Sequence, residues 1–79
     1  MTLRRYLMLH RREQTSVGDL ARDLAADPCA RRLRAYESLR AHLEGHGAGW
    51  QAIDALDGAH ALWREARYDA LREQGRSTR

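Results

Sequence analysis

Residues 42–46 read HLEGH, and two histidines at this spacing are candidate metal ligands. Zinc proteases use H-E-x-x-H, in which the glutamate directly follows the first histidine and acts beside the metal. Here Glu44 comes two residues after His42, about 200° away around a helix, so it cannot act on a metal held by His42 and His46. Gly45 is also expected to end the helix before His46. The sequence therefore predicts no metal site and no cofactor.

Cys29 is a second candidate for chemistry, because a cysteine can act as a nucleophile. Either Cys29 or His60 could also be the third ligand of a metal held by the two histidines. It follows a proline and precedes arginines at 31 and 32, and cationic neighbours favour the reactive thiolate. A nucleophile also needs a base, and no histidine lies near Cys29 in the sequence. We expect a semi-buried loop residue. With no glycine-rich phosphate loop and no Ser-His-Asp arrangement either, the chain is expected not to be an enzyme.

Length and composition predict one small domain. The chain has 79 residues, of which 43% are hydrophobic, and no apolar run approaches the roughly 18 residues of a membrane span. Its mean hydropathy is −0.74. The N-terminal MTLRRYLMLHRRE has no small-residue cleavage site, which argues against a signal peptide. A single cysteine allows no internal disulfide, so a reducing cytoplasm is the expected location.

The basic residues are unevenly distributed. All 14 are arginines, and the net charge is +3. Residues 1–34 carry eight arginines against four acids, residues 35–63 one against four, and residues 64–79 five against three. Such segregation is typical of a face that binds nucleic acid or an acidic partner. The absence of lysine, together with abundant alanine and glycine, favours a GC-rich coding bias, and the binding face stays open as the alternative interpretation.

Apolar periodicity predicts four helices, over about 3–12, from 16 to the Asp27-Pro28 pair, over 35–44 and over 50–73. Thr2 and Ser16 are the expected N-caps, and residues 28–33 the expected loop. The domain is assigned to residues 1–74. Residues after about Arg67 are expected to project or fray, and residues 75–79 to be a disordered tail.

The same periodicity assigns inward faces to the helices. In the first helix Met8 falls on the solvent side, between two arginine pairs. The second has a stripe of Val17, Leu20, Ala21, Leu24 and Ala25. The third turns Tyr36, Leu39 and Leu43 inward. In the fourth, the pattern leaves open whether His60 or Trp63 faces the core; His10 and His60 both lie on apolar faces and are expected to line the core.

Two surfaces are candidate binding sites. A protein-binding surface would use exposed apolar residues as anchors: Met8, Leu9, Trp50 and Trp63. A nucleic-acid-binding surface would use arginines, if the loop before the third helix folds beside the first helix: Arg4, Arg5, Arg11, Arg12, Arg31, Arg32 and Arg34. The second helix is a poor recognition helix because its exposed positions include Asp19, Asp23 and Asp27, which would repel phosphates.

The chain resembles the YozE SAM-like family of small bacterial proteins. The resemblance covers about residues 3–63 and rests on Tyr6-Leu7, SVGDLARDLAAD, YESLRAHLEGHGA and AIDALDGAHALW. Two positions depart from the family pattern: Pro28-Cys29-Ala30 replaces an aromatic-proline pair, and the late tryptophan of the family falls on His60. The resemblance implies a compact four-helix domain similar to sterile alpha motif folds, in a family with no established biochemical role.

These observations predict an all-α, SAM-like domain with a long C-terminal helix that acts without catalysis in the cytoplasm. The expected function is protein–protein interaction, including self-association, and the alternative is nucleic-acid binding through the N-terminal arginines. No membrane and no small-molecule substrate is expected. The functional step is an analogy at the level of the fold.

Overall fold

The computed structural model describes the backbone of residues 1–77 and the side chains of residues 1–73. Within that part, the chain forms four α-helices and a short 3-10 helix, η1, with no strand. The elements are α1 (Leu3–Leu9), α2 (Ser16–Ala26), η1 (Pro28–Ala30), α3 (Tyr36–Gly45) and α4 (Trp50–Ser77). The predicted all-α, four-helix architecture with a long last helix is confirmed.

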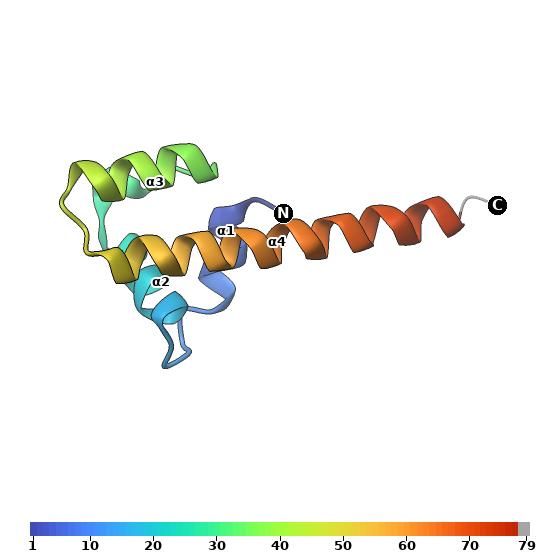
Figure 1. Cartoon of the computed structure of the whole chain (residues 1–79), viewed down its shortest axis with the longest axis horizontal. Helices are drawn as coiled ribbons and strands as arrows, with labels where there is room; N and C mark the ends of the chain where they lie inside the picture. Colours follow the sequence, from blue (N-terminus) through green and yellow to red (C-terminus); the bar gives the residue numbers. More distant parts are fainter. Residues whose placement is uncertain (78–79) are drawn as a thin grey trace.

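α4 is the central element of the fold (Figure 1). Its first half contacts α1, α2 and α3, and its second half extends away from them. Every residue from 64 to 73 is exposed, so the projecting segment begins a few residues before Arg67, where the sequence predicted its start. We call residues 64–73 the arm. The molecule is elongated: it extends 49 Å along its longest principal axis and 24 Å along the second.

α4 continues to Ser77, beyond the end that the sequence predicted near residue 73. The arm is rich in alanine, leucine, arginine and glutamate, which favour helix, and lengthening an existing helix costs little because each added residue gains a hydrogen bond. The predicted tail boundary at residue 75 therefore falls inside α4, while residues 78–79 lie outside the described residues.

The core is built from leucines and alanines on all of these elements. Six leucines are almost fully inaccessible: Leu3, Leu7, Leu20, Leu24, Leu39 and Leu56. Small side chains, among them Ala21 of α2 and Ala59 of α4, let the helices approach one another. The inward positions predicted for α3 are confirmed, since Leu39 and Leu43 are buried and Tyr36 packs against the core.

α1 and α2 are joined by a tight connection that ends α1 earlier than expected. Hydrogen bonds from His10 N to Leu7 O and from Glu13 N to His10 O turn the chain after residue 9. Arg22 Nη1 donates to Arg11 O at 2.7 Å and to Glu13 O at 2.9 Å, so that two carbonyls of the connection have a partner. The prediction that the first helix reaches residue 12 is therefore wrong.

Thr2 is the N-cap of α1 as predicted, and its hydroxyl accepts a hydrogen bond from Arg5 N. The predicted cap of α2 is wrong by one residue. Thr15 is the N-cap, with its hydroxyl 3.1 Å from Gly18 N, and Ser16 is the first helical residue. Either hydroxyl can cap a helix, and the tight turn after α1 brings Thr15 into that position.

Two predicted orientations also differ from the structure. Met8 is partly buried and packs against the core, because α1 contacts both α2 and α4 and so has more than one covered face. Ala25 is exposed, since it lies at the margin of the α2 stripe, about 80° around the helix from Val17. The predicted loop at 28–33 contains η1, whose Ala30 is fully buried.

Candidate functional site

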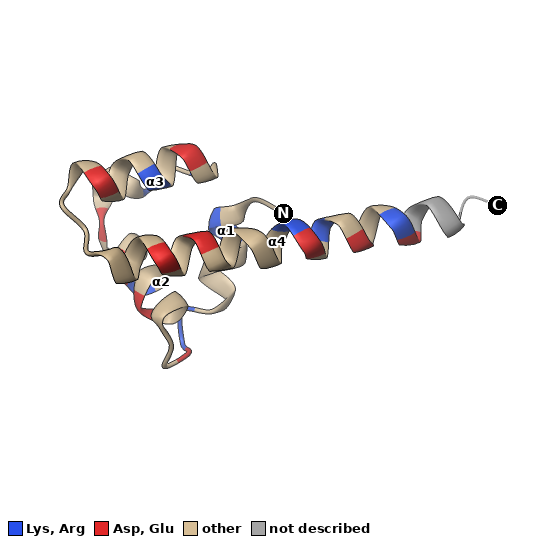
Figure 2. Ribbon diagram, viewed as in Figure 1, with Lys and Arg blue, Asp and Glu red and all other residues tan. Residues whose placement is uncertain are grey.

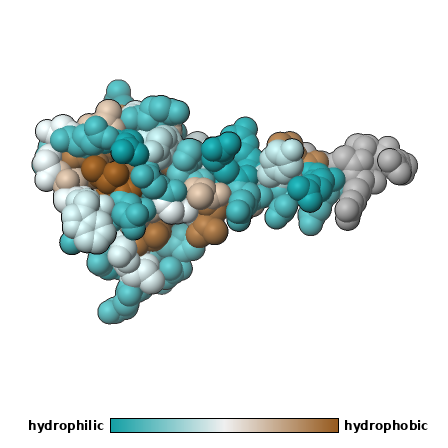
Figure 3. All heavy atoms as spheres, viewed as in Figure 1, coloured by the Kyte–Doolittle hydropathy of each residue, from teal (hydrophilic) through white to brown (hydrophobic). Residues whose placement is uncertain are grey.

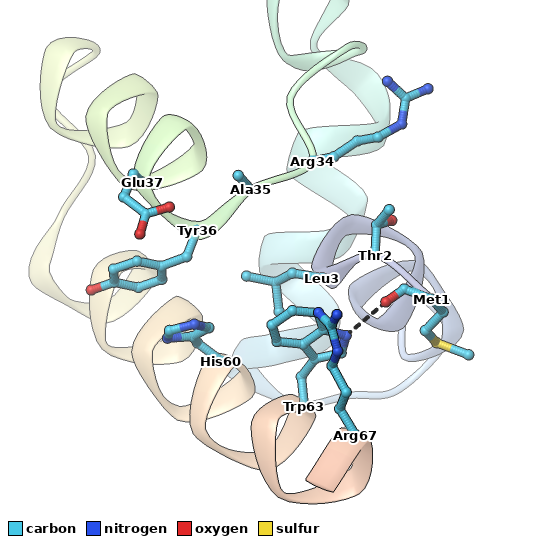
Figure 4. A pocket seen from close by; sticks show the side chains of 10 residues that line it. All are labelled: Met1, Thr2, Leu3, Arg34, Ala35, Tyr36, Glu37, His60, Trp63 and Arg67. Atoms are coloured by element: carbon cyan, nitrogen blue, oxygen red, sulfur yellow. Dashed lines mark hydrogen bonds between the residues drawn. The ribbon is translucent and has the colours of Figure 1, made fainter. Parts of the chain in front are cut away.

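A hollow in the described surface lies where the start of α1, the start of α3 and the middle of α4 meet (Figure 4). It has a volume of about 610 Å³ and we call it the groove. The residues that matter for its chemistry are Leu3, Arg34, Tyr36, His60, Trp63 and Arg67. A second hollow of about 420 Å³ shares His60, Trp63 and Arg67 with it and extends to Leu71 on the arm.

Aromatic rings form one wall of the groove. The Tyr36 and His60 rings are stacked, with centroids 4.1 Å apart and planes 15° apart, and His60 lies 5.9 Å from Trp63. The Arg67 guanidinium lies 5.4 Å from the Trp63 ring, within range of a cation–π interaction. Trp63 Nε1 donates to Met1 O at 3.1 Å, which fixes the indole against the N-terminal residues (Figure 4).

A polar network holds Tyr36 in place behind this wall. The Tyr36 hydroxyl donates to Asp57 Oδ1 at 2.6 Å and accepts from Arg40 Nη1 at 2.7 Å. Arg40 also bonds to both Asp57 oxygens and, through Nε, to Glu44 at 2.7 Å. Interactions with three residues raise the pKa of the Arg40 guanidinium: first the hydrogen bond with Tyr36, then the hydrogen bond with Glu44, and then the negative charge of Asp57. The network joins α3 to α4, so the groove wall is preorganised.

The sequence left open whether His60 or Trp63 of α4 faces inward, and in the structure both side chains are half-buried. Trp63 packs against the core cluster, and His60 lies flat on Tyr36. Both side chains line the groove, one beside the other. His10, the other histidine expected at the core, is partly exposed; its ring lies 4.9 Å from Tyr6 and its Nδ1 2.6 Å from Glu13.

A second polar cluster joins the end of α2 to α3. Asp27 Oδ2 lies 2.7 Å from His42 Nε2, and Asp27 Oδ1 accepts from Cys29 N at 2.9 Å. The hydrogen bond with His42, and then that with Cys29 N, lowers the pKa of Asp27 below its ordinary 3.8. Asp27 thereby ends α2, caps η1 and ties both to α3.

This cluster predicts a loss of stability in acid. The lowered pKa means that the unfolded chain takes up a proton at Asp27 before the folded chain does, so the contribution of Asp27 is complete above pH 3.8 and is lost as the pH falls through the folded pKa. Urea unfolding between about pH 2 and 5 should show this decline, and Asp27→Asn should flatten it. The exposed Asp23→Asn, as control, should keep the parental pH dependence; an equal flattening there would contradict the assignment.

The histidine pair of the HLEGH segment is in contact, with ring centroids 4.2 Å apart. Among the described residues, no group of three or more histidine, cysteine, aspartate or glutamate side chains is arranged to hold a metal ion. His42 Nε2 is hydrogen-bonded to Asp27, and His60, one of the two candidate third ligands, lies in the groove. Cys29 is exposed, so the expectation that it is semi-buried is wrong; η1 turns it outward while burying its neighbour Ala30.

The four predicted protein-binding residues differ in exposure. Leu9 and Trp50 are 64% and 73% exposed, whereas Met8 and Trp63 are partly buried against the core. The sequence pattern missed the exposed apolar residues around and on the arm: Leu62, Tyr68 and Leu71. For Tyr68 and Leu71 the signal was present, because they are large apolar residues in the segment after Arg67 that was expected to project. Apolar patches lie along the arm in Figure 3.

The predicted arginines are divided by the structure. Arg4 is partly buried, and its Nη1 donates to Ala30 O at 2.7 Å, which fastens η1 to α1. The loop before α3 thus lies beside α1, as the nucleic-acid hypothesis required. The remaining arginines of that set are exposed: Arg5, Arg11, Arg12, Arg31, Arg32 and Arg34.

No helix in the described part of the chain is both long and apolar enough to cross a membrane. Comparison of the chain with protein-family models, with curated proteins and with solved structures gives no match.

Proposed function

We propose that this protein is a non-catalytic protein-interaction module that binds its partner through the groove and the arm. One observation carries the proposal: Tyr68 and Leu71, 66% and 60% exposed, continue the aromatic wall of the groove along a helix that has left the core. Large apolar side chains on a projecting helix are the anchors that protein interfaces use. The preorganised wall around Tyr36 lowers the entropy cost of docking.

The proposal predicts that partner retention depends on the arm. Affinity purification from the source cells with the wild-type chain as bait should retain a partner, and Leu71→Asp should reduce its recovery at least tenfold, since a charge on the apolar contact must be desolvated on binding. Ala41→Asp, a similar change on the exposed side of α3, is the matched control. Equal recovery with both variants would remove the arm from the interface.

Nucleic-acid binding is the second candidate, and the contact between Arg4 and Ala30 O favours it by holding Arg31 and Arg32 close to α1. Binding of a labelled RNA should weaken steeply with salt, because each neutralised phosphate releases counterions. The Arg5→Ala/Arg31→Ala variant should bind more weakly and show a shallower salt dependence. Absence of binding at low salt would dismiss this candidate.

The sequence signatures also lead us to propose that the chain is related to the YozE SAM-like family and acts in the cytoplasm. The four-helix architecture is compatible with a SAM-like domain. This relationship is supported by the sequence segments that resemble the family, above all GDLA at residues 18–21 and HGA at residues 46–48.

A further inference from the structure

Four of the six charged side chains of the arm lie on two separate edges, while Arg72 lies about 20° from Glu65 around the helix, beside the acidic side chains. Glu65 and Asp69 are one helical turn apart and form an acidic edge, whereas Arg64 and Arg67 form a basic edge. At about 100° per residue, the two edges lie roughly 150° apart around α4. Figure 2 shows that acidic and basic positions alternate along the arm, and the residues from 64 to 73 include three of each sign.

The charges on these edges lack the ion pairs that other helices make. α2 and α3 have i,i+3 and i,i+4 salt bridges, Asp19–Arg22 and Arg40–Glu44. In the described part of the chain, by contrast, neither edge of the arm forms a salt bridge. Glu65 and Asp69 are moreover like charges at i,i+4, a spacing that disfavours an isolated helix. A partner that supplies cations would relieve this repulsion.

Each edge is accompanied by exposed apolar side chains. Leu62, 56% exposed, precedes Glu65 by one turn and belongs to the acidic edge. Leu71 follows Arg67 by one turn and belongs to the basic edge, which continues into the groove at Trp63. The arm thus presents an acidic amphipathic surface on one side and a basic amphipathic surface on the other.

We propose that the partner of this surface is a second copy of the chain, with the acidic edge of one copy seated on the basic edge and groove of the next. The inference rests on the proposed function and names its partner. Charge complementarity carries it, because the chain itself supplies the acidic amphipathic helix that the basic edge fits. The two edges lie on different sides of α4, so the contact is heterologous and assembly continues beyond a dimer.

A polyanion fits the same surface less well. The arm has no net charge. A nucleic acid on the basic edge would therefore lie in the field of the acidic edge of the same helix. A second arm brings carboxylates at the spacing of one helical turn and apolar side chains between them.

The test is the mass of the full chain in solution. Light scattering at low salt should give a mass that rises with concentration past that of a dimer, and added salt should lower it.

The Glu65→Arg/Asp69→Arg and Arg67→Ala/Leu71→Ala variants should each self-associate at least tenfold more weakly. An equimolar mixture of the two should assemble again but stop at the dimer, because it contains one intact acidic edge and one intact basic edge per pair. Asp23→Arg on α2 is the control and should leave the mass unchanged.

Every other outcome counts against the inference. A monomer at all concentrations overturns it, as does a dimer that does not grow, or a mixture that stays monomeric. Binding of a U20 RNA by a monomeric wild type, lost in Arg67→Ala/Leu71→Ala, would assign the basic edge to nucleic acid. If the chain is monomeric but retains a different protein in a Leu71-dependent way, the proposed function stands and only the second copy is excluded. Far-ultraviolet circular dichroism confirms that these exposed substitutions leave the helices intact.

Discussion

The Gly18→Ala variant is expected to lose about 3 kcal/mol of unfolding free energy, a large part of the roughly 4–12 kcal/mol typical of a chain of this length. A Cβ at residue 18 would lie 2.0 Å from Glu13 O and 3.0 Å from His10 O. Both are backbone atoms of the tight α1–α2 connection and cannot rotate away. The connection must therefore shift, and with it the contact between α1 and α2.

Gly58→Ala is the matched control. A Cβ there has no atom within 4 Å, and the residue lies inside α4. Alanine should raise the stability by about 0.5–1 kcal/mol, since glycine has the greater freedom in the unfolded chain. Urea unfolding of both variants measures the two changes. If Gly18→Ala is as stable as the parent, the close approach of α2 to the connection is wrong.

The Leu56→Ala variant should lose about 3–4 kcal/mol, within the range for leucine in a filled core. Leu56 has no exposed surface and lies on the half of α4 that contacts the other helices. Truncation leaves a cavity that those helices cannot close without losing contacts of their own. In a domain this small, the core has few other leucines to compensate.

Leu62→Ala tests the same chemical change on the same helix at an exposed position. Leu62 is 56% exposed, so its truncation should alter the unfolding free energy by less than about 0.5 kcal/mol. Thermal and urea unfolding of the two variants should differ accordingly. Similar losses in both would mean that the register of α4 in the core is not the one described.

The helical fold could be predicted from the sequence because the signals are local. The stripe at Leu20, Ala21 and Leu24, the hydroxyl at Thr2 and the Asp27-Pro28 stop each act within a few residues. Errors arose where two neighbours could perform the same task, as with Thr15 and Ser16, or where a distant contact decided. Met8 is such a case, because only the packing of α1 between α2 and α4 covers it.

The candidate site was predicted less well for the same reason. Trp63 was identified as an anchor, but Tyr36 of α3 and Arg34, which line the same groove, are distant from it in the sequence. No periodicity within one helix places Tyr36 flat on His60. The exposed Leu71 was within reach of the sequence, since it lies in the segment that was expected to leave the core.

By itself, the sequence determined which segments are helical, that the last helix outruns the domain, and that the arginines gather near the N-terminus, because these follow from local pattern and composition. Only the tertiary structure decided that Arg4 binds Ala30 O, that Gly18 admits no side chain, and that aromatic rings from α3 and α4 form one wall. The physical reason is that such contacts depend on how the helices are oriented against one another, which local patterns do not encode.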